Sequence, residues 1–454
     1  MPSKIRTKYI CNTCGYSAIG RFSRCPECNE WNTAVEEIIT VQKGYERKKE
    51  MISTSANIQL IDEVKSTGET RAKTEISELD RVLGGGIVKG SMILIGGDPG
   101  IGKSTLMLQI ANRIKDKKIL YVSGEESAMQ IKMRSDRLGY KLQNFFILSE
   151  TNLDIISAVI EKENPDLVVI DSIQTVYRPE IDSTPGTAVQ LRESTSYLTK
   201  IAKSNNIPMI LVGHITKEGM IAGPKILEHM VDVVLQFEGE RTHLYRILRN
   251  IKNRYGSTNE IGIFEMTDKG LIEVPNPSEV FLSQRNYGAS GCCISASVEG
   301  TRPILIEVQA LVTSTNYGIP QRTSMGFDYK RLNIIIAVLE KKLGIFLNKY
   351  DIFLNIAGGI KIEEPAIDLA VAMSIYSSFK DIPVDSDTVI LGELGLSGEV
   401  RTISFIDRRI SESSKLGFKN IIVPKNNLKN LDTKKYKIKC NGVERIREAV
   451  DSIL

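Results

Sequence analysis

A glycine-rich turn between an apolar strand and an amphipathic helix constrains the fold of this chain more than any other feature. Residues 97–104 read Gly-Asp-Pro-Gly-Ile-Gly-Lys-Ser and match the pattern GxxxxGK[ST]. The apolar residues 92–95 precede the turn as a buried strand, and a helix is expected from Lys103. Glycines let successive backbone N–H groups point at phosphate oxygens, and the helix N-terminus adds a positive dipole end. The sequence therefore predicts a nucleotide-binding α/β domain.

The residues of this turn have expected parts in holding ATP and Mg²⁺. The Lys103 ammonium should reach the β- and γ-phosphates, and the Ser104 hydroxyl should ligate Mg²⁺. Thr105 is expected at the α-phosphate. The predicted nucleotide- and magnesium-binding residues are Gly96, Gly97, Asp98, Pro99, Gly100, Ile101, Gly102, Lys103, Ser104, Thr105 and Asp171.

Two further strand ends carry the acids that hydrolysis needs. The apolar run 167–170 ends at Asp171, where a P-loop enzyme places the carboxylate of its Mg²⁺ shell. The run 118–122 leads to Glu125 and Glu126, and one of these is expected to polarise the attacking water as general base. Glu125 is favoured, and Glu126 remains the alternative.

A third strand end carries a histidine. The apolar run 208–212 is followed by Gly213 and His214. A polar side chain at this tip is a candidate sensor of the γ-phosphate, and a structurally neutral histidine is the alternative. Helical stretches at 128–138, 153–162 and 188–202 alternate with the strands, which favours a mostly parallel sheet covered on both faces.

Two CxxC pairs near the start of the chain indicate a metal site. Their two-residue spacing lets both thiolates of a pair face one ion, and four sulfurs close a tetrahedral shell about 2.3 Å from Zn²⁺. We expect a structural zinc ribbon whose folding energy comes largely from the metal. Its basic and aromatic neighbours either contact DNA or a partner, or form a solvated face. The expected ligands are Cys11, Cys14, Cys25 and Cys28.

Length and composition exclude several classes of protein. A chain of 454 residues is long enough for about three domains. No apolar run approaches the roughly 20 residues of a membrane helix, and residues 1–15 carry no secretory signal, so we expect a cytoplasmic protein with no membrane partner. The net charge of +4 says little about partners.

These features, in this order, resemble the RecA-like ATPase core, and the match is closer to the bacterial DNA repair protein RadA (Sms) family. The resembling segments are the four-cysteine head, RVLGGGIVKGSMILIGGDPGIGKSTL, YVSGEES, VVIDSIQT, residues 212–239, and KNRYG at 252–256, where the family has KNRFG. The resemblance implies a DNA-dependent ATPase motor in recombination and the response to DNA damage. Its implied partners are single-stranded and branched DNA and the recombinase (RecA) filament, and its implied assembly is a hexameric ring.

In RecA-like assemblies the nucleotide lies between subunits, and a cation from the neighbour completes the site. Lys252 and Arg254 have the same parity along a strand, so both can point one way. They are the candidate trans-acting cations, with a basic hairpin tip as the alternative. Lys217 and Lys225 in the glycine-rich segment 216–225 are candidate DNA contacts, with an ordinary loop as the alternative. Arg285 is a weaker candidate.

The last part of the chain resembles the proteolytic domain of Lon protease. The matching segments are GGIKIEEPAIDLAVAMSI, LGELGLSGEVRTI and KLGFKNIIVP. Ala366 stands where the protease has its nucleophilic serine, and Asp407 stands at the lysine position in an alignment that is open by one or two residues. Without serine and lysine no acyl-enzyme forms. We therefore expect an inactive scaffold whose basic stretches 415–425 and 429–439 contact either DNA or solvent.

The expected domains are a zinc finger at 1–34, a linker at 35–57, a RecA-like P-loop ATPase at 58–274, and a Lon-like α+β domain at 275–454 whose motifs lie in about 350–454. Two other functions compete with the DNA motor. One is a RecA-like switch or scaffold without motor activity. The other is an ATP-dependent protease, which Ala366 disfavours.

Overall fold

The computed structural model describes residues 5–11, 16–40, 71–214, 227–239, 245–258, 260–282, 288–315, 318–429 and 431–452. Several predicted features lie outside these residues: Cys14, Lys217, Lys225, Arg285, a short element near 58–64, and the side chain of His214. The chain divides into two compact units. The first contains 1–238, 248–262 and 266–273, and the second contains 239–247, 263–265 and 274–454.

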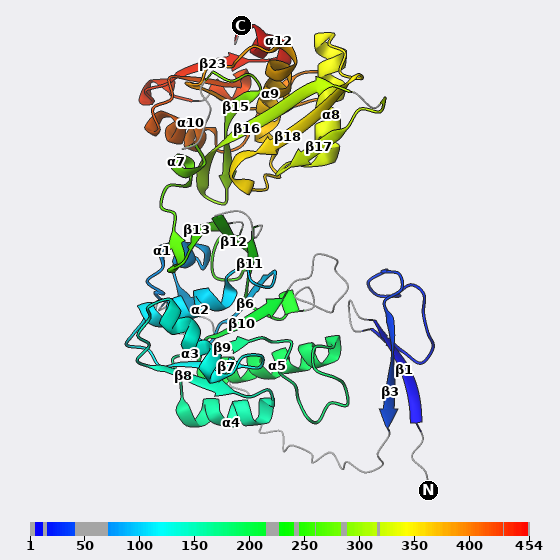
Figure 1. Ribbon diagram of the computed structural model, residues 1–454, viewed down its shortest axis with the longest axis vertical. Helices are drawn as coiled ribbons and strands as arrows, with labels where there is room; N and C mark the ends of the chain where they lie inside the picture. The colour runs from blue at the N-terminus through cyan, green and yellow to red at the C-terminus, as the bar shows by residue number, and fades with distance from the viewer. Residues whose placement is uncertain are drawn as a thin grey trace, which may run out of the picture. The chain divides into compact units, whose positions relative to one another are not determined.

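The N-terminal head is a small antiparallel sheet. Strand β1 (Ile5–Cys11) pairs along its whole length with β3 (Ala34–Thr40), and β2 (Ser17–Ala18) pairs with the end of β1 (Figure 1). Cys11 is the last residue of β1, and Cys25 lies in the turn region that follows β2; both are buried. The sheet thus brings Cys11, at the end of a strand, close to the turn that carries Cys25.

A nine-stranded sheet forms the centre of the first unit, in the order β14-β13-β12-β11-β6-β10-β9-β7-β8. The six strands from β11 to β8 are parallel, which confirms the mostly parallel sheet expected from the alternation of strands and helices. The strands are β6 (Met92–Gly97), β7 (Ile119–Ser123), β8 (Phe145–Ser149), β9 (Leu167–Asp171), β10 (Met209–His214), β11 (Val233–Glu238), β12 (Tyr245–Asn253), β13 (Ile261–Thr267) and β14 (Gly270–Glu273).

Helices cover this sheet because its strands are apolar on both faces. On one face, Leu120 and Val122 of β7 and Val168 and Ile170 of β9 pack in one cluster with α4 and α5. Side chains alternate along a strand, so Tyr121 of β7 points to the other face. The helices are α1 (Ser77–Val82), α2 (Lys103–Arg113), α3 (Ala128–Arg137), α4 (Leu153–Glu163) and α5 (Ala188–Asn205), and a small ladder joins β4 (Arg71–Ala72) to β5 (Ile87–Val88).

The second unit contains a seven-stranded sheet in the order β17-β18-β16-β15-β19-β22-β23. The hairpin of β15 (Cys292–Glu299) and β16 (Arg302–Ser314) is antiparallel, whereas β19 (Thr388–Ile390), β22 (Asn420–Pro424) and β23 (Lys439–Val443) run parallel to their neighbours. This mixture is the expected α+β class. The remaining strands are β17 (Arg322–Met325), β18 (Tyr350–Ile356), β20 (Glu393–Leu394) and β21 (Val400–Arg401).

Helices pack on this second sheet around a separate apolar core, which includes Ile294, Leu305, Val389 and Ile421. The predicted helix at 365–378 consists of a 3-10 turn, η3 (Pro365–Ile367), followed by α9 (Asp368–Lys380). The others are α7 (Pro277–Leu282), α8 (Tyr329–Leu343), η2 (Ala357–Gly359), α10 (Ile406–Lys415), α11 (Lys425–Leu428), η4 (Thr433–Lys435) and α12 (Ile446–Asp451). Among the residues described, no helix has the length and apolar character needed to cross a membrane.

Candidate functional site

The glycine-rich turn links the end of β6 to the start of α2, as the sequence predicts. Two of its glycines lie close to neighbouring side chains. A Cβ on Gly97 would lie 2.9 Å from the Cβ of Phe237, and one on Gly102 would lie 2.8 Å from the Cε of Met266. Gly102 also has a φ of 120°, which favours glycine. The backbone conformation of the turn therefore depends on these two residues.

Lys103 is buried beneath the turn, with 4% of its surface exposed. Its Nζ donates hydrogen bonds to the carbonyl oxygens of Gly97 at 2.7 Å and Asp98 at 3.0 Å. Burial lowers the pKa of Lys103, although the negative charges of Asp171, Asp98 and Glu125 act in the opposite direction. A phosphate group is thus able to replace the two carbonyls as the partner of a cation that the fold already holds in place.

The Ser104 hydroxyl donates to Asp171 Oδ2 over 2.7 Å, so the first turn of α2 meets the tip of β9. The hydroxyl of Tyr121 on β7 donates to the same carboxylate oxygen. Burial, and next the charge of Asp171, raise the pKa of Tyr121 well above its ordinary value. Hydroxyl and carboxylate oxygens suit Mg²⁺, which binds through one or two carboxylates and substrate phosphates. Ser104 and Asp171 therefore fit the ion.

Glu125 and Glu126 lie beyond the end of β7 with different partners. Glu125 is exposed, and its Oε1 accepts a hydrogen bond of 2.7 Å from the buried Ser172, the residue after Asp171. Glu126 forms an ion pair with Arg134 of α3. Only Glu125 is thus attached to the tip of β9. The Asp171–Ser172 peptide bond is cis.

The tip of β10 lies beside the same turn. In the parallel register, Gly213 pairs with Gly96 and His214 pairs with Gly97. Because β10 also pairs with β9, it separates the strand of the glycine-rich turn from the strand of Asp171. The backbone of His214 is therefore at the same end of the sheet, the carboxyl end of its parallel strands, as Lys103, Ser104 and Asp171.

Arg254 and Lys252 lie at the opposite, amino end of the parallel strands. Arg254 pairs with Asp232 at 3.4 Å, and Asp232 also accepts a bond of 3.0 Å from the backbone N–H of Met92, the first residue of β6. Lys252 Nζ donates to the carbonyls of Glu228 and Val231 at 2.7 and 2.9 Å. Six residues of strand span about 16 Å. The length of β6 therefore separates Arg254 from the glycine-rich turn of its own chain.

The N-terminal head brings three cysteines together. The sulfurs of Cys11, Cys25 and Cys28 lie within 4.8 Å of one another, and those of Cys11 and Cys28 are 3.6 Å apart. In a tetrahedral shell with zinc–sulfur bonds of about 2.3 Å, two sulfurs lie about 3.8 Å apart. This spacing and the thiolate chemistry fit Zn²⁺.

Three family models match separate parts of the chain. The family described as AAA domain matches residues 61–220, the one described as rubredoxin metal binding domain matches 9–36, and the one described as subunit ChlI of Mg-chelatase matches 318–427. The DNA repair protein RadA of Bacillus subtilis (strain 168) is 50% identical over 456 residues, covering 100% of this chain and 99% of the relative. The chain belongs to the DNA repair protein RadA family.

Another RadA, from Listeria monocytogenes, is 51% identical over 454 residues and is likewise covered for 99% of its length, with 100% of this chain matched. A KaiC-like protein from Pyrococcus horikoshii is 22% identical, with a TM-score of 0.39, over 46% of this chain and 100% of its own. The RadA relatives and the three family models confirm the predicted family, the zinc ribbon, the P-loop ATPase core and the α+β C-terminal domain.

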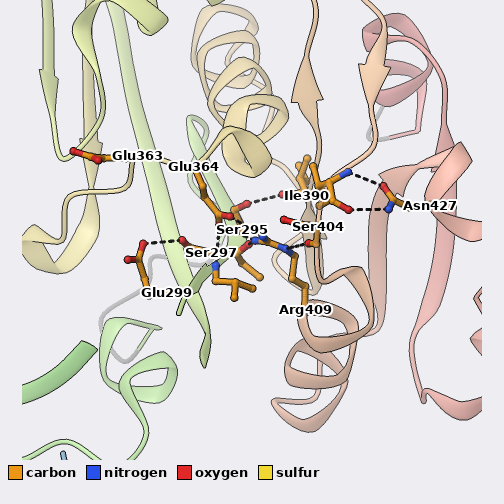
Figure 2. A network of polar contacts seen from close by, with 12 residues as sticks. Ser295, Ser297, Glu299, Glu363, Glu364, Ile390, Ser404, Arg409 and Asn427 are labelled. Atoms are coloured by element: carbon orange, nitrogen blue, oxygen red, sulfur yellow. Dashed lines mark hydrogen bonds and ion pairs between the residues drawn. The ribbon is translucent and has the colours of Figure 1, made fainter. Parts of the chain in front are cut away.

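In this RadA family member, the position of the Lon-type nucleophile is closed. Ala366 is 2% exposed, and Asp407, at the expected lysine position, is exposed on the first turn of α10. The buried residue of that turn is Arg409, two positions later. Its guanidinium binds both carboxylate oxygens of Glu364 at 2.7 and 2.6 Å and the carbonyls of Ala296 and Ser404 (Figure 2).

Three basic residues of this Lon-like domain have local partners. Arg322 donates to the carbonyls of Leu347 and Tyr350, which indicates a structural role. In the two lysine-rich stretches, Lys419 pairs with Asp387 at 2.6 Å and Lys425 pairs with Glu444 at 3.0 Å. These ion pairs favour a solvated face for both lysines.

Sequence reasoning missed two residues of the nucleotide site, Tyr121 and Ser172. Ser172 was visible only as the residue after the strand acid. Tyr121 carried a weak signal, because it is the one residue with a polar side chain among the four residues 119–122 of an otherwise apolar strand. Both are polar side chains that lie beside predicted site carboxylates once the strands pair.

Proposed function

We propose that this chain is a DNA-stimulated ATPase motor that acts on branched intermediates of homologous recombination as a homo-oligomeric ring. One observation carries the proposal. Lys103, Ser104, Asp171 and Glu125 converge at the carboxyl end of the parallel strands, while Arg254 lies at their amino end. Each chain then has a nucleotide site at one end of its strands and a cation for a neighbour's site at the other end. The names of the RadA relatives, which are DNA repair proteins, support the biological setting.

The chemistry of ATP cleavage follows from the residues at the first edge. Mg²⁺, when bound by Ser104 and Asp171, neutralises charge on the β- and γ-phosphates. Lys103 leaves the carbonyls of its own turn and binds phosphate oxygens. Glu125, held by Ser172, accepts a proton from the attacking water and orients it. The backbone N–H groups of the turn bind the remaining phosphate oxygens.

Arg254 is the better candidate for the trans-acting cation. Its side chain is 58% exposed and has a weak 3.4 Å contact with Asp232, so it is accessible to a second chain. Lys252 is bound to two backbone carbonyls, and burial followed by the charge of Arg254 lowers its pKa. We assign Lys252 to holding the segment in place. An arginine finger contributes about 10³–10⁵ in rate.

DNA contact is assigned to Lys217, Lys225 and Arg285 on the strength of the sequence, together with His214 as the γ-phosphate sensor. In the sequence, segment 216–225 begins two residues after His214, the last residue of β10, so on this proposal a change at the γ-phosphate would reach the segment through that strand. Non-specific grip on DNA through lysine and arginine requires no base reading. The recombinase filament is the proposed protein partner, and a hexamer is the proposed ring.

We assign no proteolytic activity to the Lon-like domain. The methyl group of Ala366 offers no nucleophile, and Arg409 cannot accept a proton because its guanidinium stays charged. The Ala366→Ser variant should therefore leave casein uncut, since Asp407 stands where the protease has its lysine base and the Glu364 carboxylate is held by Arg409. Casein degradation by the unmodified chain would contradict this assignment.

The decisive experiment is ATP turnover at low salt with and without single-stranded DNA, with Lys103→Ala as the inactive reference. Low salt is required because phosphate contacts weaken steeply with ionic strength. We expect stimulation by DNA in the unmodified protein and loss of turnover with retained ATP binding in Arg254→Ala. Mixing Arg254→Ala with Lys103→Ala subunits should partly restore turnover. A rate that DNA leaves unchanged would favour the alternative of an ATPase switch without motor activity.

A further inference from the structure

Tyr121 is a buried tyrosine whose hydroxyl ends on the magnesium-binding carboxylate. It is 1% exposed, and it donates to Asp171 Oδ2, the oxygen that also accepts the 2.7 Å bond from Ser104. A buried tyrosine needs one acceptor for its hydroxyl, and in most cores a backbone carbonyl suffices. Here the acceptor is the acid on which nucleotide chemistry depends.

The register of two strands brings these two side chains to the same face of the sheet. Tyr121 pairs with Val169, and Ser123 pairs with Asp171, so Tyr121 and Asp171 lie on the same face, two residues apart along the strand direction. Two residues of strand span about 6.6 Å, a distance that a phenol ring bridges and a serine side chain does not. The ring of Phe145 packs beside Tyr121 with centroids 5.4 Å apart, which restricts its movement.

We propose that Tyr121 is a positioning residue for the Mg²⁺ site: its hydroxyl holds the carboxylate of Asp171 in the orientation that binds the ion. This inference rests on the proposed nucleotide site. The carboxylate of Asp171 can rotate about its bond to the Cβ atom. The hydroxyl of Tyr121, as a second donor beside Ser104, restricts this rotation. Residues that hydrogen-bond to a metal ligand without touching the metal orient that ligand, and their loss typically costs about 10–100-fold in metal affinity or activity.

A tyrosine that serves only to fill the core makes a different prediction. Loss of its hydroxyl would lower stability, because the cost of an unmade hydrogen bond is about 1 kcal/mol, and would leave the metal requirement unchanged. The positioning role instead predicts a higher Mg²⁺ requirement in a protein that is folded. The Mg²⁺ concentration needed for nucleotide binding therefore distinguishes the two roles, whereas a loss of activity would not.

The test is binding of a fluorescent ATP analogue to the full chain during a Mg²⁺ titration. In Tyr121→Phe the Mg²⁺ concentration at half-maximal binding should rise about 10-fold or more, with near-normal binding at saturating Mg²⁺. Tyr197→Phe is the matched control, because the Tyr197 hydroxyl contacts Ser157 at 3.2 Å, away from the site, and its loss should leave the titration unchanged.

Circular dichroism establishes that the variant is folded. Should Tyr121→Phe fail to fold, Tyr121→Met removes the same hydroxyl and provides the same comparison. A folded variant with the Mg²⁺ dependence of the unmodified protein would overturn the role of Tyr121 and leave the proposed function intact. An unmodified protein whose binding ignores Mg²⁺ would instead overturn the proposed nucleotide site.

Discussion

Ser172 donates its hydroxyl to Glu125 over 2.7 Å, one residue after the carboxylate of Asp171. The bond attaches an exposed acid beyond the end of β7 to the buried residue that follows β9, so Glu125 is tied to the strand end that carries Asp171. Glu126, the next residue, is turned towards Arg134 of α3. Adjacent glutamates in the sequence thus have different surroundings, and this difference distinguishes the two candidate bases.

The first prediction compares these glutamates. Glu125→Gln should lower the turnover number for ATP by about 10²–10⁴, because the amide cannot accept the proton of the attacking water. Nucleotide affinity should remain within a few-fold. Glu126→Gln is the matched control and should keep most of the activity. Steady-state ATPase rates and equilibrium ATP binding provide the measurements, and a larger rate loss in Glu126→Gln would reverse the assignment.

The second prediction concerns the ion pair at the closed Lon-type site. Arg409 has no exposed side-chain surface, so Glu364→Gln leaves a buried cation without its counter-charge and should cost about 3–5 kcal/mol. Arg409→Met should cost a similar amount, and the double variant should cost less than the sum. Scanning calorimetry of the full chain measures the effect.

An exposed pair next to this site provides the control. Lys361 and Glu363 contact each other at 2.6 Å with side chains 68% and 76% exposed, so Lys361→Met should change stability by about 0–1 kcal/mol. Additive losses in the Glu364–Arg409 cycle would mean that the pair does not act as a unit.

Local sequence patterns predicted the parts of the site that depend on spacing within one segment. The glycine-rich turn, the strand ends at Asp171 and Glu125, and the clustered cysteines follow from short motifs and apolar runs. Helix ends were less certain: α5 continues to Asn205, three residues past the prediction, because Asn206 adopts the left-handed conformation that ends it.

Contacts between strands could not be predicted in the same way. The hydrogen bond from Tyr121 to Asp171 depends on the register of β7 against β9. The position of Arg254 at the amino end of the parallel strands depends on how the strands are arranged in the sheet. Arg409 is a different case, since arginine is almost never fully buried and no local pattern marks an exception. Its partner, Glu364, lies 45 residues away.

The third prediction concerns pH. Burial raises the pKa of Asp368, at the start of α9, to about 6, against the opposing charge of Arg331 at 2.8 Å. Since the pKa in the unfolded chain is about 3.9, the folded state binds more protons between these values. The free energy of unfolding should therefore fall as pH rises from about 4 to about 6, by at most about 3 kcal/mol.

Asp368→Asn removes this dependence, so the unmodified protein should lose stability relative to the variant over that window. Denaturant unfolding of both proteins at pH 4, 5, 6 and 7 measures the difference. A difference that moves the opposite way would show that Arg331 outweighs burial and that the carboxylate is charged throughout.

The fourth prediction uses Trp31, the single tryptophan of the chain, as a reporter of the zinc ribbon. Trp31 lies in a bridge with Arg24, whose guanidinium is 5.7 Å from the centre of its ring, so its fluorescence reports the fold of the head. A chelator that removes Zn²⁺ should change Trp31 emission, because metal binding supplies about 10–16 kcal/mol to such heads.

ATP binding at the P-loop should persist after chelation once Mg²⁺ is restored, since its residues belong to a core with its own apolar interior. Cys25→Ser should reproduce the effect of the chelator on Trp31, whereas Cys440→Ser, in the Lon-like domain, should leave the emission unchanged. Unaltered Trp31 emission in a sample from which zinc has been quantitatively removed would mean that Cys11, Cys25 and Cys28 are held together by the sheet alone. We expect the emission to change, because a sheet of two full strands and the two-residue β2 buries too little apolar surface to fold unaided.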